Sequence, residues 1–270
     1  MFRADLHCHT QCSDGSLTPT ELILLAKQVG LQGISITDHD NIAAYTTAIS
    51  AAQKEGILLG TGVEFSCDHK GQNVHVLGYG FSLTSSDIAE LCSRHTIRRK
   101  ERNSGILKKL SASRMPIEED ELKGTMIGRP HIAQIMVKKG YVSSIKEAFN
   151  LYIGDGKSCY VRGDAFSLKE TIDAIHRGGG KAFLAHPHLY SRTALVEEIL
   201  SSSSFDGLEC HYSRCHPYQE RRWLKLALKR QLLISGGSDF HGDIKPQIPL
   251  GCSWVDKETF DRIFTPMSNG

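Results

Sequence analysis

Several features that would define a protein class are missing from this chain of 270 residues. No run approaches the roughly 18 apolar residues of a membrane-spanning helix, and no apolar stretch precedes the charged opening segment. The net charge is only +2, which gives no general reason to bind nucleic acid or membranes. A Gly-rich phosphate loop of the P-loop type is also absent. We therefore expect a cytoplasmic protein that makes no membrane contact and needs no obligate protein partner.

The eight cysteines are scattered, and none of them forms a C-x-x-C pair. A chain of this length can bury a sizeable core and does not depend on disulfides for stability. We interpret the cysteines as mostly free thiols, which indicates a reducing compartment.

Short apolar segments alternate with helical patterns over most of the chain. The first helix is predicted to have Thr18 as its N-cap, Pro19 at its first position and Glu21 closing a capping box. Alternation of strands and helices is typical of a parallel sheet, and about seven strands favour a barrel-like α/β fold over an open sheet. The predicted strands are Asp5–Thr10, Gly33–Thr37, Ile57–Val63, Asn73–Tyr79, Lys181–Ala185, Gly207–Cys210 and Leu232–Gly236.

The pattern changes between residues 85 and 161, where long helical patterns replace the strand signals. We predict a helical insertion at 85–161, which interrupts a domain formed by 1–84 and 162–270. A dense basic section runs from Arg94 to Lys109. This section suits a lid over a polyanionic substrate, because phosphate contacts dominate nucleic-acid affinity. A solvated cationic helix face is the alternative.

Ionisable side chains recur at the ends of the predicted strands. His7 and His9 are separated by one residue in an extended segment, so both imidazoles project to the same side. Because functional groups of α/β barrels gather at the carboxyl ends of the strands, residues far apart in the sequence are expected to converge. The other members of this set are His39, Glu64, His75, His186, Asp239 and His241.

A cluster of this composition indicates a metal site. Without a cation, so many buried ionisable groups would leave lone pairs unsatisfied, whereas metal ions stabilise the same arrangement. Nitrogen-rich ligation with a few carboxylates suits manganese, iron or zinc better than magnesium. Two ions about 3.5–4 Å apart can hold a phosphate and lower the pKa of a bridging water, so that hydroxide attacks phosphorus. Hydrolysis of a phosphate ester is one reaction that such a pair of ions would support.

Five segments resemble, in the right order, the signature segments of the polymerase-and-histidinol-phosphatase (PHP) superfamily. The resemblance implies a distorted seven-stranded α/β barrel that holds two or three divalent ions, with manganese as the first expectation and iron or zinc as alternatives. The segments are Asp5–Thr10, Thr37–His39, Gly62–Glu64, Ala185–Pro187 and Gly237–His241.

The resemblance also implies a ligand set. Glu64 is expected to bridge two ions, and Glu64, Asp239 and His241 are expected to act in catalysis. Asp14 is expected to be a ligand of a third ion. In the alternative interpretation Asp14 is an ordinary turn residue, and the site then holds two ions. The implied ligands are His7, His9, Glu64 and Asp239 for a first ion, His75 and His186 with Glu64 for a second, and Asp14, His39 and His241 for a third.

The segment Ile127–Ala133 begins a helical pattern inside the predicted insertion. There Arg129 can offer a two-pronged contact to a phosphate, and His131 can add a donor near a helix N-terminus; an ordinary helix start is the alternative. The segment resembles the Gly-Arg-x-His sequence of one PHP branch. The stand-alone members of that branch remove phosphate from nucleoside 3',5'-bisphosphates and trim short RNA from its 5' end.

The predicted function is therefore a metal-dependent phosphoesterase whose substrate is a small phosphorylated nucleotide or a short RNA. A histidinol-phosphate phosphatase is the alternative among enzymes. A non-catalytic, metal-binding PHP module is the alternative from another class.

Overall fold

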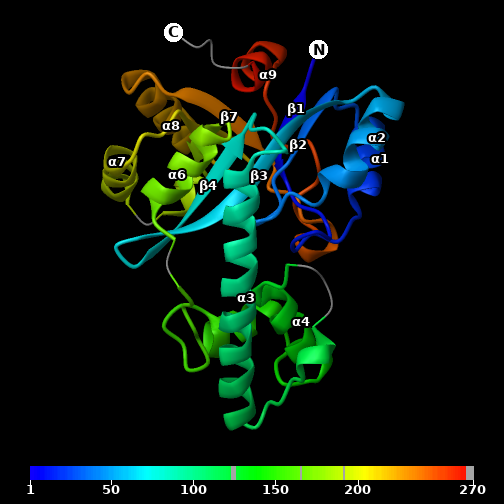
Figure 1. Ribbon diagram of the computed structural model, residues 1–270, viewed down its shortest axis with the longest axis vertical. Helices are drawn as coiled ribbons and strands as arrows, with labels where there is room; N and C mark the ends of the chain where they lie inside the picture. The colour runs from blue at the N-terminus through cyan, green and yellow to red at the C-terminus, as the bar shows by residue number, and fades with distance from the viewer. Residues whose placement is uncertain (123–125, 165, 191, 266–270) are drawn as a thin grey trace. The chain divides into compact units, whose positions relative to one another are not determined.

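The computed structural model describes residues 1–122, 126–164, 166–190 and 192–265, which divide into two compact units. Unit 1 comprises Met1–Cys92 and Phe166–Gly270, and unit 2 comprises Ser93–Ala165, drawn in green tones in Figure 1. The predicted insertion, 85–161, begins close to the start of helix α3 (Ser86–Ala112), which runs from unit 1 into unit 2.

Seven strands of unit 1 form one sheet in their sequence order (Figure 1). The chain after β7 returns to β1, because the N–H of Asp239 donates to the His7 carbonyl at 2.7 Å and the N–H of His9 donates to the Phe240 carbonyl at 2.9 Å. These bonds nearly close the sheet, and the predicted seven-stranded barrel is confirmed. The strands are β1 (Ala4–Cys8), β2 (Gly33–Ile36), β3 (Leu58–His69), β4 (Gln72–Tyr79), β5 (Lys181–Leu184), β6 (Gly207–Tyr212) and β7 (Leu233–Gly237).

The helices follow the predicted alternation. The start of α1 is confirmed, since the Thr18 hydroxyl accepts the N–H of Glu21 and the Glu21 carboxylate accepts the N–H of Thr18. Besides α3, the helices are α1 (Pro19–Gln28), α2 (Tyr45–Glu55), α4 (Arg129–Lys138), α5 (Ile145–Ala148), α6 (Leu168–Arg177), α7 (Thr193–Ser202), α8 (Pro217–Lys229) and α9 (Lys257–Phe264).

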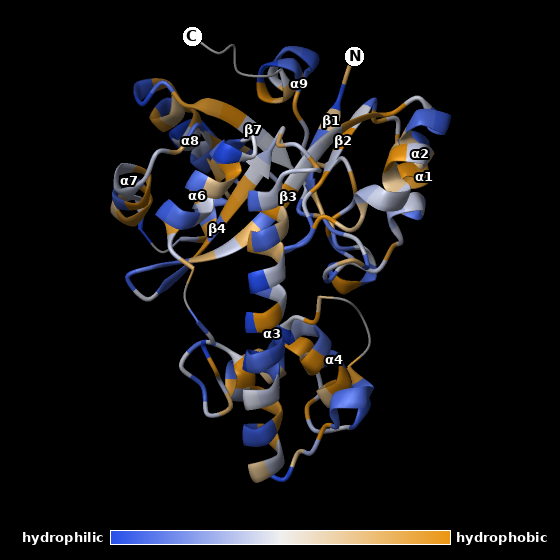
Figure 2. Cartoon of the chain, viewed as in Figure 1, coloured by the Kyte–Doolittle hydropathy of each residue, from blue (hydrophilic) through white to orange (hydrophobic). Residues whose placement is uncertain are grey.

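The expectation of a parallel sheet is wrong for β4, which is antiparallel to both β3 and β5. Strands β3 and β4 are joined by only Lys70 and Gly71, whose φ angles are 50° and 89°. Two residues with positive φ form a tight hairpin turn, whereas a parallel connection needs a crossover of a dozen or more residues. In Figure 2 this turn is hydrophilic, and hydrophobic residues appear only further along β4, where the strand is buried.

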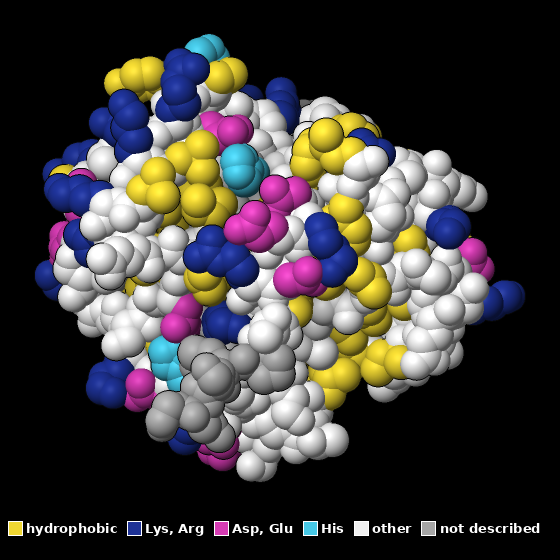
Figure 3. Space-filling view, turned by 90° about the horizontal axis from the view of Figure 1, so that it is seen from above, with side chains coloured by type: hydrophobic (Ala, Val, Ile, Leu, Met, Phe, Trp, Pro, Cys, Tyr) yellow, Lys and Arg dark blue, Asp and Glu magenta, His cyan; other side chains and the backbone are white. Residues whose placement is uncertain are grey.

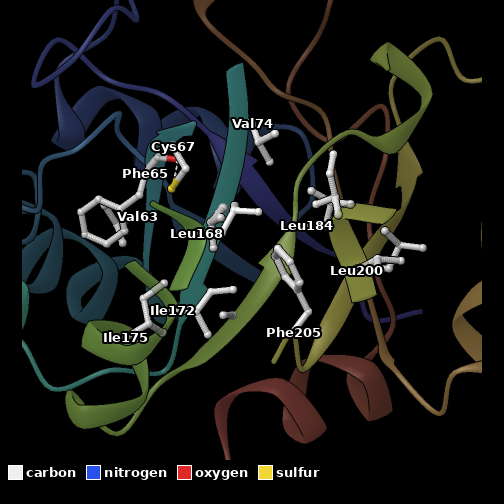
Figure 4. Packing of buried hydrophobic residues seen from close by; sticks show 14 of the residues in the cluster. Val63, Phe65, Cys67, Val74, Leu168, Ile172, Ile175, Leu184, Leu200 and Phe205 are labelled. Carbon is white, nitrogen blue, oxygen red and sulfur yellow. Dashed lines mark hydrogen bonds between the residues drawn. The ribbon is translucent and has the colours of Figure 1, made fainter. Parts of the chain in front are cut away.

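Helices cover the sheet through separate apolar clusters. Figure 4 shows the largest of these, in which Phe65 and Val63 of β3 lie near Ile172 and Ile175 of α6. A second cluster joins α1 and α2 to β1 and β2. Unit 2 has an apolar core of its own, formed by residues between Ile106 and Cys159.

Charged side chains of both signs are interspersed on the face of the molecule shown in Figure 3. This distribution agrees with the small net charge of +2. Within the described part of the chain, no helix is long and apolar enough to cross a membrane. All eight cysteines lie in the described ranges, and none of them forms a disulfide.

Gly237 lies where β7 approaches β1. A Cβ atom at this position would lie 2.3 Å from the backbone nitrogen of His7, so a side chain would force the two strands apart. We expect Gly237→Ala to lower the free energy of unfolding by about 1–3 kcal/mol and to reduce metal binding, because the displaced residue is a predicted ligand. Thermal denaturation and elemental analysis after dialysis measure the two effects.

Gly56→Ala is the matched control for this substitution. Gly56 has a positive φ, 67°, but nothing lies within 4 Å of the position that an alanine methyl group would take there. Its replacement should therefore lower stability through backbone strain alone. Equal metal content in Gly237→Ala and Gly56→Ala would contradict the claim that the close approach of β7 to β1 at Gly237 keeps His7 in position for metal binding.

Candidate metal centre

The predicted metal-binding side chains converge at one end of the barrel in unit 1. Three groups each bring one potential ligand atom per residue to within 4.8 Å of one another: His7, His9, Glu64 and Asp239; His9, Asp14, His39 and His241; and His39, Glu64 and His75. His186 is the one predicted ligand outside these groups. Its Nε2 nevertheless lies 2.9 Å from Glu64 Oε1 and 3.2 Å from His75 Nδ1.

Glu64 lies at the centre of the cluster and is almost fully buried. Its Oε1 lies 2.7 Å from His75 Nδ1 and 2.9 Å from His186 Nε2. Its Oε2 instead faces three other imidazole nitrogens at 3.1–3.3 Å, those of His7, His9 and His39. Because the two oxygens of one carboxylate face different sets of imidazoles, Glu64 has the geometry of a bridging ligand.

Two details of the predicted strand ends are corrected. The sequence predicts Glu64 at the end of a strand, but β3 continues past it to His69 because the chain there forms the hairpin with β4. The sequence likewise predicts His75 near a strand end, and it lies in the first half of β4. Since β4 runs antiparallel to its neighbours, its first half lies beside the end of the barrel where the other ligands gather.

Buried nitrogen atoms provide a test of whether metal ions fit this site. Nε2 of His7, Nε2 of His9 and Nδ1 of His39 are buried and have no hydrogen-bond partner. They lie 3.1–3.5 Å from carboxylate oxygens of Glu64 and Asp239. Two ligands about 2.0–2.2 Å from a common ion are separated by roughly 3–3.5 Å at tetrahedral or octahedral angles. The donor set therefore fits divalent ions.

The charges of the cluster support the same conclusion. Burial alone would raise the pKa of Glu64, but the charges of His39, His75 and His7 hold it well below its usual value. Burial would likewise lower the pKa of His9, yet its contacts with Asp239 and Glu64 raise it to about 9. Ionised carboxylates that stabilise positive charge on buried imidazoles form a site where a divalent cation can replace protons.

Known proteins match this chain in both sequence and fold. The PHP domain matches residues 5–245, which include every ligand discussed above. The chain belongs to the PHP domain family. With the ligand clusters, this membership shows that the protein is a metal-dependent phosphoesterase with a multi-metal site, and the enzyme prediction is confirmed.

Three relatives illustrate the similarity of this PHP domain to known proteins. A 5'-3' exoribonuclease of Haemophilus influenzae is 32% identical over 259 residues, which cover 93% of this chain and 92% of the relative. A 3',5'-nucleoside bisphosphate phosphatase of Chromobacterium violaceum is 32% identical over 258 residues, which cover 89% and 88%. A crystal structure of a Bifidobacterium adolescentis protein, described as a metal-dependent phosphoesterase, has a TM-score of 0.87, 30% identity and coverage of 96% and 94%.

Two buried acids of the PHP domain hold the ligand-bearing segments, although no role was predicted for them. Asp38 accepts hydrogen bonds from the N–H and hydroxyl of Thr10 at 2.7 and 2.6 Å and from the Ser13 hydroxyl at 2.6 Å. This fixes the loop between His9 and Asp14. Asp5 accepts the N–H groups of His7, Ser238 and Gly251 and thereby ties the segment after β7 to β1.

Asp239 has its two oxygens in different surroundings. Its Oδ2 accepts hydrogen bonds from the Tyr212 hydroxyl at 2.6 Å and from Lys245 Nζ at 2.7 Å. Its Oδ1 faces the imidazoles of His7 and His9. Tyr212 and Lys245 were also missed, because nothing in their local sequence distinguishes them from ordinary strand-end and loop residues.

Arg129 and His131 begin helix α4 in unit 2, at the predicted helix start. Arg129 forms an ion pair with Asp155, and its guanidinium carbon lies 5.6 and 5.4 Å from the ring centroids of Phe149 and Tyr160. His131 Nδ1 accepts the N–H of Gly128 at 3.0 Å. All these contacts lie within unit 2, and the substrate-binding roles of the two residues stay predictions.

The bridging geometry of Glu64 leads to a test by metal analysis. We expect Glu64→Ala to lose more metal than His75→Ala, because Glu64 contributes to two ligand groups and His75 to one. Elemental analysis of dialysed, manganese-loaded protein measures the difference. Glu198→Ala is the control, since Glu198 is a half-exposed acid that bonds Lys70 and His69 away from the cluster. Wild-type metal content in Glu64→Ala would refute the bridging assignment.

Proposed function

We propose that this PHP domain hydrolyses phosphate esters of nucleotides, either a nucleoside 3',5'-bisphosphate or the 5' end of a short RNA. The observation that carries the hydrolytic chemistry is the buried Glu64 carboxylate between two sets of imidazoles. The choice of substrate is supported by the two relatives, an exoribonuclease and a nucleoside bisphosphate phosphatase, each 32% identical to this chain.

The proposed cofactors are two or three divalent ions, manganese first and iron or zinc as alternatives. His7, His9, Asp14, His39, Glu64, His75, His186, Asp239 and His241 would hold them. When bound, such ions lower the pKa of a water molecule and neutralise charge on phosphoryl oxygens. The role of Glu64, Asp239 and His241 in catalysis is proposed to consist of holding these ions in fixed positions.

The exposure of the ligands indicates the side from which a phosphate enters. The side chains of His7 and His9 are fully buried, whereas those of His39 and His75 are 14% and 20% exposed. Lys245, whose side chain is 34% exposed, adds a positive charge beside Asp239. We propose that the substrate phosphate approaches past His39 and His75, and that Lys245 contributes to its attraction.

The thiol state of the cysteines supports a cytoplasmic location, which is part of this proposal. Disulfides persist in oxidising compartments and are rare in the cytosol.

A substrate panel tests the proposed function. Manganese-loaded protein should release phosphate or nucleotide from a nucleoside 3',5'-bisphosphate or a 5'-phosphorylated RNA oligomer, and Asp239→Asn should abolish the release. Turnover of histidinol phosphate alone would make the protein a histidinol-phosphate phosphatase. Metal-loaded protein that hydrolyses none of the three substrates would overturn the proposed substrate class.

Arg129 is tested by steady-state kinetics on the nucleotide substrate. If its guanidinium binds a substrate phosphate, Arg129→Ala should raise KM about 10- to 100-fold, since a hydrogen bond to a charged group contributes about 1.5–3 kcal/mol. Arg177→Ala is the control, because Arg177 also pairs with an aspartate, Asp87, but is largely exposed in unit 1. An unchanged KM in folded Arg129→Ala would assign Arg129 to the packing of unit 2 alone.

A further inference from the structure

Glu209 is a completely buried acid on β6 that belongs to none of the three ligand groups. Each of its carboxylate oxygens accepts a hydrogen bond from a residue of the metal centre. Oε1 lies 2.8 Å from His7 Nδ1, and Oε2 lies 2.6 Å from the backbone nitrogen of His186. Among the described residues, His7 is its one ion-pair partner within 4 Å. Both strong contacts of this carboxylate therefore lead to predicted metal ligands.

The contact with His7 determines which ring nitrogen is available to a metal ion. An ionised carboxylate only accepts hydrogen bonds, so the Nδ1 that faces Glu209 carries a proton. In the neutral ring, Nε2 then has a bare lone pair. This Nε2 is buried without a hydrogen-bond partner and lies 3.3 Å from Glu64 Oε2 and 3.5 Å from Asp239 Oδ1. The tautomer that Glu209 selects is thus the one that can ligate an ion at this position.

The contact with His186 restrains an unusual backbone conformation. His186 has φ 30° and ψ 60°, in the left-handed region that residues other than glycine rarely adopt. Such a residue persists only when its surroundings hold it in place. The bond from its N–H to Glu209 supplies such a restraint, and in this conformation the imidazole reaches Glu64 Oε1.

We propose that Glu209 is a positioning residue of the metal centre. One carboxylate fixes the tautomer of His7 and the turn at His186, so that the two imidazoles face opposite oxygens of Glu64. Glu209 acts through these ligands and contacts no reacting atom. The inference rests on the proposed metal-binding roles of His7 and His186 and is independent of which phosphate ester is hydrolysed.

The chain contains a matched control for this role. Asp206, which directly precedes β6, also accepts hydrogen bonds from an imidazole and a backbone N–H, those of His176 and Ala182, both at 2.7 Å. His176 is not among the predicted ligands. Both bonds are made to Oδ2 of Asp206, so Asp206→Asn removes the charge of a carboxylate beside an imidazole without affecting the ligands.

The first experiment is a Mn²⁺ titration of Glu209→Gln. His7 and His186 face different oxygens of Glu209, and a glutamine places an NH₂ donor at one of the two positions, so it cannot accept from both. We expect the dissociation constant for Mn²⁺ to rise about 10- to 100-fold, the usual effect of removing a partner of a ligating histidine. Asp206→Asn should keep the wild-type Mn²⁺ affinity even if its melting temperature falls. Folded Glu209→Gln with wild-type Mn²⁺ affinity would overturn the proposal.

A second experiment needs no variant at Glu209 and holds even if Glu209→Gln fails to fold. In Zn²⁺-loaded wild-type protein, which is diamagnetic, nitrogen-15 NMR should show His7 protonated at Nδ1. Protonation at Nε2 would overturn the proposal. His7→Ala tests the ligand assignment separately from the role of Glu209. Undiminished Mn²⁺ content in His7→Ala would show that His7 is not a ligand, and the proposed role of Glu209 would then fail as well.

Discussion

One buried carboxylate, that of Glu64, faces five imidazoles, and much of the barrel serves to bring them to it. Burying an ionised carboxylate costs free energy, and the cost grows when several histidine side chains are buried in the same water-free site. Three of the imidazole nitrogens that lie close to carboxylate oxygens, Nε2 of His7 and His9 and Nδ1 of His39, have no hydrogen-bond partner. Divalent cations relieve both problems, because they neutralise the carboxylates and provide these three nitrogens with a partner. The proposed ions would thus serve both the stability of this end of the barrel and its chemistry.

The segments that close the barrel are the same segments that carry predicted metal ligands. His7 belongs to the first strand and Asp239 follows the last, and the backbone bond between them is part of the closing seam. Asp5 strengthens the seam by accepting N–H groups from both sides of it. The antiparallel β4 contributes in a different way, since a two-residue turn reverses the chain and brings His75 beside Glu64. A strictly parallel barrel would place this histidine nearer the other end of the sheet.

The sequence was sufficient to predict the barrel and the convergence of its ligands. Seven apolar segments with ionisable residues at their ends follow from strand periodicity, and the spacing of His7 and His9 places both on one side of β1. The direction of β4 was not predicted, because Lys70-Gly71 is not one of the usual two-residue hairpin sequences, although Gly71 readily takes the positive φ that such a turn needs. Asp5 and Asp38 lay inside the recognised segments without an assigned role. Their partners are backbone N–H groups of distant residues, and such pairings depend on tertiary structure that local patterns do not encode.

The acids of this barrel show why residue type alone does not determine function. Asp38 and Asp5 are as buried as Glu64, and all three lie on or directly after strands. Asp38 and Asp5 accept hydrogen bonds from N–H and hydroxyl donors, although burial still raises the pKa of both carboxyls, that of Asp5 to about 6. Glu64 faces nitrogens that can be bare, and bare nitrogens and carboxylate oxygens are both acceptors. Two acceptors at 3.1–3.3 Å require a proton or a cation between them. The donor or acceptor character of the neighbours therefore separates the carboxylates that hold the protein together from those that are predicted to hold metal.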